Sequence, residues 1–258
     1  MRGKRLATVL VAAVGFLAAF ADPVAAQQYQ SVTESLIRSL NRTMLAAALP
    51  ITLLVEGILV YTVWKFRNND EAKPTKENRR LEITWTVATA VVLLFVGVAA
   101  YGVMAQPTVT ATQADAQEAM AEDDTVVVDA VGVQWFWNYE YPEENLTVSS
   151  GTATGDVDYG NQPMVVPEDT KLVIRTESAD VIHAFHAPEI GLKADAVPGQ
   201  TNYLITEVNE KGTYQLYCAE FCGQGHSEML GEIIVVEEDK YQEWVEDPEN
   251  TSVGSGDN

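Results

Sequence analysis

Two long apolar runs constrain the fold of this chain more than any other feature of its sequence. They cover residues 43–66 and 83–104, and the segment that separates them is polar and basic. At a rise of about 1.5 Å per residue, a helix formed by either run exceeds the roughly 30 Å hydrocarbon core of a bilayer. Both runs should therefore span the membrane, and the sequence predicts a transmembrane hairpin within residues 27–104.

The distribution of basic residues predicts the orientation of this hairpin. Lys and Arg cluster between and beside the two runs, whereas neither residue type occurs from residue 105 to residue 170. Cytoplasmic loops carry an excess of Lys and Arg, so the short loop is expected to be cytoplasmic. The large C-terminal part would then lie on the outer face of the cell (plasma) membrane.

The first 26 residues have the pattern of a signal peptide. Three basic residues near the start precede an apolar run at residues 6–21, and Val24, Ala25 and Ala26 form a small-residue cleavage site before Gln27. The alternative is a retained membrane anchor, which needs about 20 apolar residues, more than this run supplies. Export of the C-terminal part agrees with the orientation that the basic residues predict.

The rest of the chain is predicted to be a linker, a β domain and a tail. Residues 105–124 are rich in Ala, Gln, Thr and acids and are expected to be a linker, in part helical, with little to bury. Residues 248–258 are expected to be a disordered polar tail. Between them, residues 125–247 contain short alternating runs of Val, Ile, Tyr and Trp separated by turns, which is typical of an antiparallel β-sandwich. The predicted strands are residues 125–133, 135–141, 171–176, 202–208, 213–217 and 231–236.

Residues 218–229, CAEFCGQGHSEM, contain both cysteines of the chain together with a histidine, a glutamate and a methionine. Thiolate and thioether sulfurs are soft donors, so this loop suits copper better than a hard cation. His183, in the segment DVIHAFHAP, could complete the ligand set. A disulfide and a structural zinc site are the alternatives. Met229 argues against both, because methionine is a poor zinc ligand and has no role in a disulfide.

The motif resembles that of the cytochrome c oxidase subunit II family, in which a Cys-x-Glu-x-Cys sequence is followed by His and Met. The resemblance implies a cupredoxin-like Greek-key sandwich that holds two copper ions in a dinuclear centre, CuA. The two thiolates would bridge the coppers, each histidine would bind one copper, and the thioether and one backbone carbonyl would be weak ligands. The implied metal ligands are His183, Cys218, Glu220 through its carbonyl, Cys222, His226 and Met229. His186 is expected to be a neighbour, since residues three apart on a strand face opposite sides.

The resemblance implies further roles for three residues. Trp135, in the segment GVQWFWNYEY, takes the position of the family's electron-entry tryptophan; core packing is the other explanation for such an aromatic run. Glu82, in LEITWT, takes the position of a glutamate at the mouth of a proton channel, and a capping role at the helix start is the alternative. The carboxylate of Glu220 would bind a magnesium ion shared with subunit I.

The function implied is that of the electron-input subunit of a terminal respiratory haem-copper oxidase. It would accept electrons from an external cytochrome c or small copper protein and pass them to haem in subunit I, where oxygen reduction is coupled to proton pumping. Subunits I and III are the implied partners. The alternatives are a copper-free quinol oxidase subunit II, the copper domain of nitrous oxide reductase, which the two helices argue against, and a copper-delivery protein.

The charge of the predicted outer part is strongly acidic. Residues 105–258 contain five Lys and Arg against thirty Asp and Glu, a net charge of −25. An acidic surface would steer a cationic donor towards the domain. An excess this broad fits a surface adapted to high salt better, because salt would screen long-range steering. The same charge argues against nucleic-acid binding.

Overall fold

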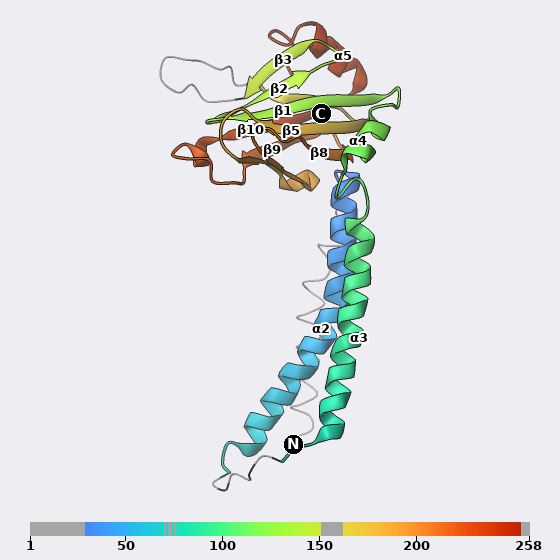
Figure 1. Cartoon of the computed structure of the whole chain (residues 1–258), viewed down its shortest axis with the longest axis vertical. Coiled ribbons are helices and arrows are strands. Elements are labelled where there is room, and N and C mark those ends of the chain that lie inside the picture. The colour runs from blue at the N-terminus through green and yellow to red at the C-terminus, as the bar shows by residue number, and fades with distance from the viewer. Residues whose placement is uncertain (1–28, 70, 72–73, 75, 151–161, 254–258) are drawn as a thin grey trace, which may run out of the picture.

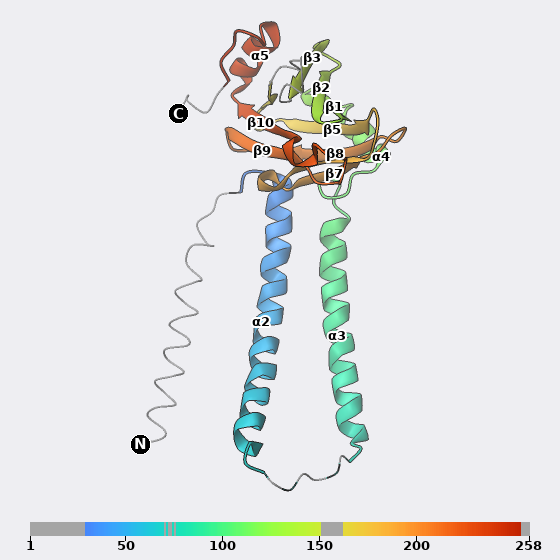
Figure 2. The ribbon, with the colours of Figure 1, turned by 90° about the vertical axis from the view of Figure 1, so that its left-hand side faces the viewer.

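Two long helices carry a β-sandwich at one end of the molecule, and the short loop that joins the helices lies at the other end (Figures 1 and 2). The computed structural model describes residues 29–69, 71, 74, 76–150 and 162–253. The predicted signal peptide therefore lies outside the described residues, as does the end of the predicted tail.

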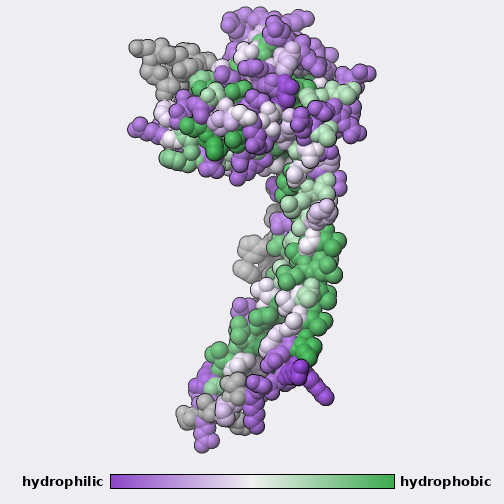
Figure 3. All heavy atoms as spheres, viewed as in Figure 1, coloured by the Kyte–Doolittle hydropathy of each residue, from purple (hydrophilic) through white to green (hydrophobic). Residues whose placement is uncertain are grey.

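The helices are α2 (Val32–Phe66) and α3 (Arg79–Met104), and they confirm the predicted hairpin. Each begins at a side-chain cap: Ser31 accepts from the amide of Glu34, and Asn78 accepts from the amide of Leu81. Apolar side chains are exposed along both helices and form the green band of Figure 3. In a chain with so many buried apolar residues elsewhere, an exposed apolar band of this length marks the surface that faces lipid or other membrane helices.

The helix α2 begins eleven residues before the apolar run, because its first turns pack against the sandwich. The Ser31 hydroxyl donates to the carbonyl of Ile190 at 2.7 Å. The Thr33 hydroxyl donates to the carbonyl of Thr108 at 2.9 Å and lies 2.8 Å from the Thr206 hydroxyl. Ser31 and Thr33 are both buried. The sandwich is thus attached to the hairpin by buried hydrogen bonds as well as by the chain itself.

Within the residues that the structure describes, ten strands form the two sheets of the sandwich. In spatial order, the first sheet consists of β3 (Leu146–Ser150), β2 (Phe136–Tyr141), β1 (Thr125–Val133), β5 (Lys171–Ser178) and β8 (Asn202–Glu207). The second consists of β4 (Met164–Pro167), β10 (Leu230–Val236), β9 (Gly212–Cys218), β6 (His183–Ala187) and β7 (Leu192–Ala196). Alternation along β2 buries Trp137, Tyr139 and Tyr141 between the sheets.

The sheets are mixed, so the prediction of a purely antiparallel sandwich is wrong. Strand β1 pairs in parallel with β5, and β4 pairs in parallel with β10. Neither pair is joined by a hairpin: both partners are distant in sequence, which leaves room for the long connection that a parallel pair needs. All six predicted strands are present, and β3, β4, β6 and β7 were not predicted because they are short.

Two short helices were not predicted in their observed roles. The predicted linker contains α4 (Gln113–Ala119), whose Ala116 and Ala119 are buried against the first sheet, so this segment does bury apolar surface. The helix α5 (Glu238–Glu246) buries Tyr241 and Trp244, and the Trp244 ring lies edge-on to Tyr141 with centroids 5.3 Å apart. Val253, in the predicted disordered tail, also packs against the core.

Candidate metal centre

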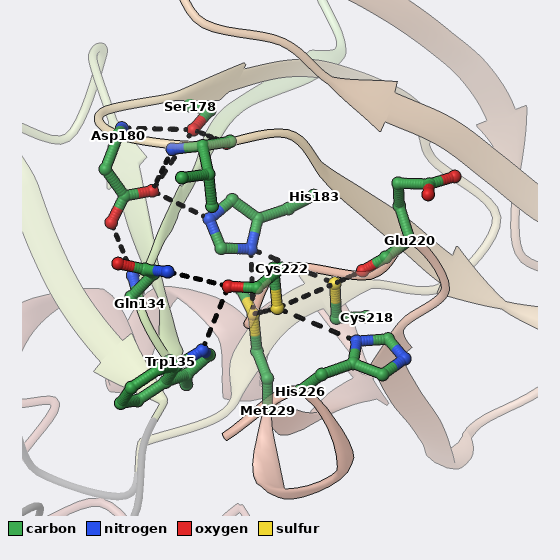
Figure 4. A network of polar contacts seen from close by, with 11 residues as sticks. Gln134, Trp135, Ser178, Asp180, His183, Cys218, Glu220, Cys222, His226 and Met229 are labelled. Atoms are coloured by element: carbon green, nitrogen blue, oxygen red, sulfur yellow. Dashed lines mark hydrogen bonds and ion pairs between the residues drawn. The ribbon is translucent and has the colours of Figure 1, made fainter. Parts of the chain in front are cut away.

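The end of the sandwich next to the loop after β9 brings five candidate ligands together (Figure 4). His183 is the first residue of β6, and Cys218 is the last residue of β9. Cys222 follows in the loop, His226 opens the 3-10 helix η3 (His226–Glu228), and Met229 directly precedes β10. Because β6 and β9 are hydrogen-bonded neighbours, the sheet places His183 beside the cysteine loop despite their separation in sequence.

The donor atoms of these residues face one another. The sulfur atoms of Cys218 and Cys222 are 3.7 Å apart. Nδ1 of His183 lies 3.1 Å from the Met229 sulfur and 3.8 Å from the Cys218 sulfur. Nδ1 of His226 lies 3.6 Å from the Cys222 sulfur. Within the described residues, His183, Cys218 and Cys222 form a buried cluster whose donor atoms all lie within 4.8 Å of one another.

This geometry fits metal ions bridged by two thiolates. A disulfide requires sulfurs about 2.05 Å apart, so the two cysteines are not joined in this structure. Two metal–sulfur bonds of about 2.3 Å at a tetrahedral angle would hold sulfurs about 3.8 Å apart, close to the separation observed. The Met229 sulfur is fully buried and lies 3.8 Å from the Cys222 sulfur. A thioether among the inward-facing donors favours copper over zinc.

The carbonyl of Glu220 also faces the centre, whereas its carboxylate does not. Its carbonyl oxygen lies 3.2 Å from the Cys218 sulfur. Its carboxylate points away from the sulfurs and accepts from the backbone amide of Phe221 at 3.1 Å (Figure 4). The residue can thus present its two oxygen-bearing groups to different surroundings.

A carboxylate orients the ring of His183. Nε2 of His183 lies 2.8 Å from Oδ1 of Asp180. A neutral ring that donates its Nε2 proton to Asp180 keeps the lone pair on Nδ1, the atom that faces the sulfurs. Gly132 lies against the same ring, since a Cβ at position 132 would come within 2.9 Å of His183 Cδ2. The histidine is therefore held in place from two sides.

Two residues between β1 and β2 contact the loop after β9. The indole N–H of Trp135 donates to the carbonyl of Cys222 at 3.1 Å, and the side-chain amide of Gln134 donates to the same oxygen at 2.7 Å. The indole ring covers Gly225 so closely that a Cβ there would lie 2.5 Å from Trp135 Cδ2. Trp135 is partly exposed and also packs against the core of the sandwich.

The two thiols differ in acidity. Burial raises the pKa of the Cys218 thiol, but its contacts with the His183 side chain and with the neighbouring backbone outweigh burial and lower that pKa to about 6. Burial and the negative charge on Cys218 raise the pKa of Cys222 to about 12. One sulfur of the pair therefore carries a charge at neutral pH while the other keeps its proton, which a metal ion must displace.

Two further residues singled out in the sequence, His186 and Glu82, lie away from the five candidate ligands. Nδ1 of His186 lies 2.9 Å from the carbonyl of Leu192, and its ring packs edge-on to Tyr217. Glu82 lies in the first turn of α3, at the end of the hairpin far from the sandwich, and it is exposed. The structure therefore separates Glu82 from the ligand cluster along the full length of the helices (Figure 2).

Sequence reasoning missed the contacts of Asp180 and Gln134. Both residues lie close in sequence to predicted site residues. Asp180 is three positions before His183, and Gln134 directly precedes Trp135. The sequence signal for such contacts was a polar residue close to a predicted ligand. The partner of each polar residue could not be identified from the sequence, because the contacts join separate loops.

Comparison with known proteins agrees with the motif. The family described as "Cytochrome C oxidase subunit II, periplasmic domain" matches residues 126–238, and the one described as "Cytochrome C oxidase subunit II, transmembrane domain" matches residues 23–103. The chain is 30% identical over 254 residues to cytochrome c oxidase subunit 2 of Cereibacter sphaeroides, covering 88% of this chain and 77% of that protein. It is 33% identical over 207 residues to a probable subunit 2 of Rickettsia bellii, covering 76% and 72%.

Among solved structures, the chain is similar to the periplasmic domain of subunit II of cytochrome oxidase of Bradyrhizobium japonicum. The identity is 35%, the TM-score is 0.43, and the match covers 47% of this chain and 91% of that one. The expected architecture, a two-helix transmembrane hairpin followed by a β-sandwich, is confirmed. The sandwich matches the periplasmic-domain model of the family and is the outer-face domain of a membrane protein.

Proposed function

The chain belongs to the cytochrome c oxidase subunit II family, and on that premise we propose that it is the electron-input subunit of a terminal respiratory oxidase. It would accept electrons from an external cytochrome c or small copper protein at a dinuclear copper centre and pass them to haem in subunit I. Oxygen reduction, coupled to proton pumping, would take place in subunit I. The observation that carries the proposal is the convergence of two free thiols, two imidazole Nδ1 atoms and one thioether.

The proposed ligand roles follow the directions of these donors. Cys218 and Cys222 would hold both metal ions, and His183 and His226 would each hold one. Met229 and the Glu220 carbonyl would be weak ligands. When bound, two copper ions that share one unpaired electron supply a one-electron carrier whose bonding changes little between its two oxidation states.

The protein contributes rigidity to electron transfer. His183 starts one strand and Cys218 ends another strand of the same sheet, and His183, Cys218, Cys222 and Met229 are all buried. Buried side chains that other groups hold in place need little rearrangement when charge arrives, and burial shields the centre from solvent.

Trp135 is the proposed entry point for electrons. Its ring is partly exposed, and its N–H reaches the carbonyl of the proposed ligand Cys222 at 3.1 Å. This contact supplies a short connection from the surface to the centre. The acidic outer domain would attract a cationic donor where salt is low, while the breadth of the acidic surface fits adaptation to high salt.

Further partners and sites complete the proposal. The hairpin would pack against subunit I and lie near subunit III in the plasma membrane, after removal of residues 1–26. The Glu220 carboxylate, which faces away from the sulfurs, would bind a magnesium ion shared with subunit I. Glu82, exposed at the cytoplasmic end of α3, would lie at the mouth of a proton channel in subunit I.

Metal analysis of the purified full-length chain tests the proposed centre. We expect two copper ions per chain and an electron paramagnetic resonance spectrum of one spin shared by both. Cys218→Ser or Cys222→Ser should abolish this spectrum, whereas Met229→Leu should shift the reduction potential and weaken binding. A paired-copper signal that survives in both Ser variants would show that the ligand assignment is wrong.

The donor is tested with the purified oxidase complex. Oxidation of a reduced cytochrome c or small copper protein, without oxidation of quinol, is the expected result. The opposite preference, with no bound copper, would indicate a quinol oxidase subunit. Trp135→Phe should slow electron entry from the protein donor while oxygen reduction driven by a small artificial donor continues.

A further inference from the structure

The loop that carries Cys222 is held by a residue outside the ligand set. Gln134 lies between β1 and β2, and its side-chain Nε2 donates to the carbonyl of Cys222 at 2.7 Å. Its backbone N–H donates to Oδ2 of Asp180 at 2.8 Å. The other oxygen of the same carboxylate lies 2.8 Å from Nε2 of His183. Gln134 thus contacts the backbone of one proposed ligand, Cys222, and the carboxylate that orients another, His183 (Figure 4).

We propose that Gln134 is a positioning residue of the metal centre. It sets the spacing between the loop before β6, which contains Asp180, and the loop that carries Cys222. This inference rests on the copper role proposed above and adds a residue that the ligand motif does not contain. Gln134 does not touch the metal; it acts through Asp180 on one side and through the Cys222 carbonyl on the other.

The Cys222 carbonyl depends on side-chain donors. Within the described residues, no backbone amide in a turn or loop donates to it, and its donors are Gln134 and Trp135. A carbonyl oriented by two donors fixes the peptide plane after Cys222, and with it the direction of the cysteine side chain. Loss of one donor leaves this peptide plane held by the other donor alone, so it is less constrained.

The local backbone leaves space for this contact. Gly223 has a φ of +117°, which side chains rarely adopt, and a Cβ there would lie 3.0 Å from Nε2 of Gln134. A side chain at position 223 would therefore press on the amide that holds the carbonyl. Glycine at this position provides both the turn and the room for Gln134.

Gln134→Met tests the proposal, because Met has a similar length and volume but no amide donor. The backbone contact to Asp180 remains in this variant, so the side-chain bond is tested by itself. Gln242→Met is the matched control: Gln242 is an exposed glutamine on α5 whose amide donates to Glu238 at 2.9 Å, away from the centre. All variants are made in the full-length chain, purified in detergent and loaded with copper.

Three quantities are measured: the rate of copper release to an excess of chelator, the paired-copper spectrum, and the melting temperature of the metal-free chain. Because loss of a partner that orients a ligand lowers metal affinity about 10–100-fold, we expect Gln134→Met to release copper about tenfold faster. Its spectrum should shift, and its metal-free melting temperature should match the wild type. Gln242→Met should match the wild type in all three measurements.

The possible failures are distinguishable. Release by Gln134→Met within about twofold of the wild-type rate, with an unchanged spectrum, would overturn the positioning role. Faster release with an equal loss of metal-free stability would also overturn it, since the residue would then support the fold in general. Absence of bound copper in the wild-type chain would instead overturn the proposed function.

Discussion

His183 presents its two ring nitrogens to opposite surroundings: Nε2 lies 2.8 Å from the carboxylate of Asp180, and Nδ1 lies 3.1 Å from the sulfur of Met229. The carboxylate fixes the ring orientation and selects the tautomer whose Nδ1 is free to bind a metal. A residue three positions earlier in the chain thus orients this proposed ligand before any metal arrives.

Removal of this carboxylate should weaken copper binding. Asp180→Ala deletes the group that orients His183, so we expect copper affinity to fall about 10–100-fold in a competition titration against a chelator. Asp239→Ala, at an exposed position on α5, is the control and should leave the affinity unchanged. Equal affinities of the two variants would show that Asp180 does not orient the ligand.

Gly225→Ala should disturb the centre by moving Trp135. The added Cβ would lie 2.5 Å from the indole ring, which is too close for any arrangement without a shift. Overpacking of this kind costs about 1–3 kcal/mol, and displacement of the indole should also alter the paired-copper spectrum. Gly231→Ala is the control, because the Cβ added there would press on Tyr139 in the core instead of on Trp135. It should lower stability and leave the spectrum unchanged.

Thr33→Val should loosen the attachment of the sandwich to α2. The substitution keeps the shape of the side chain but removes the hydroxyl that bonds Thr108 and Thr206, and a buried group left unpaired costs about 1–3 kcal/mol. We expect a lower melting temperature, measured by tryptophan fluorescence. Thr43→Val, which removes only a hydroxyl bonded within the helix to Ser39, should have little effect. Equal melting temperatures of the Thr33→Val variant and the wild type would contradict the attachment of the sandwich to α2 by buried hydrogen bonds.

Trp244→Ala should destabilise the sandwich strongly although the residue lies in a short terminal helix. Trp244 is 1% exposed and packs on Tyr141, and loss of a buried tryptophan costs about 3–5 kcal/mol. The urea midpoint of unfolding measures this loss. On the same helix, Gln242→Ala should change stability by no more than about 0.5 kcal/mol, as is usual for surface positions. A small effect of Trp244→Ala would show that α5 is not part of the core.

Copper affinity should rise with pH. Cys222, whose pKa burial raises to about 12, must lose its proton on binding, whereas Cys218, with a pKa lowered to about 6, is already a thiolate at neutral pH. Release of one proton predicts an affinity about tenfold higher per pH unit between about pH 8 and pH 10. Towards acid pH the dependence should steepen, because Cys218 and His183 must also lose protons. A chelator titration at several pH values measures this slope, and a flat profile would contradict it.

The ligand motif and the hairpin could be predicted from the sequence because each depends on neighbouring residues. A helix spans a bilayer if one continuous run of side chains is apolar, and residues 218–229 supply most of the proposed ligands from one loop. His183 was expected from its own segment to lie beside this loop, and the structure places its ring next to Cys218 and Met229. The six longest strands were also predicted, since alternation over several residues is a local signal.

The supports of the centre were decided by the tertiary structure. Gln134 and Cys222 are 88 positions apart, and Gln134 and Asp180 are 46 apart, so these hydrogen bonds exist only after two sheets have brought their loops to one end. The same holds for the parallel pairing of β1 with β5 and for the burial of α5, whose charged sequence gives little sign of a core contact. A sequence states which donors a chain has, but their partners depend on packing between distant segments.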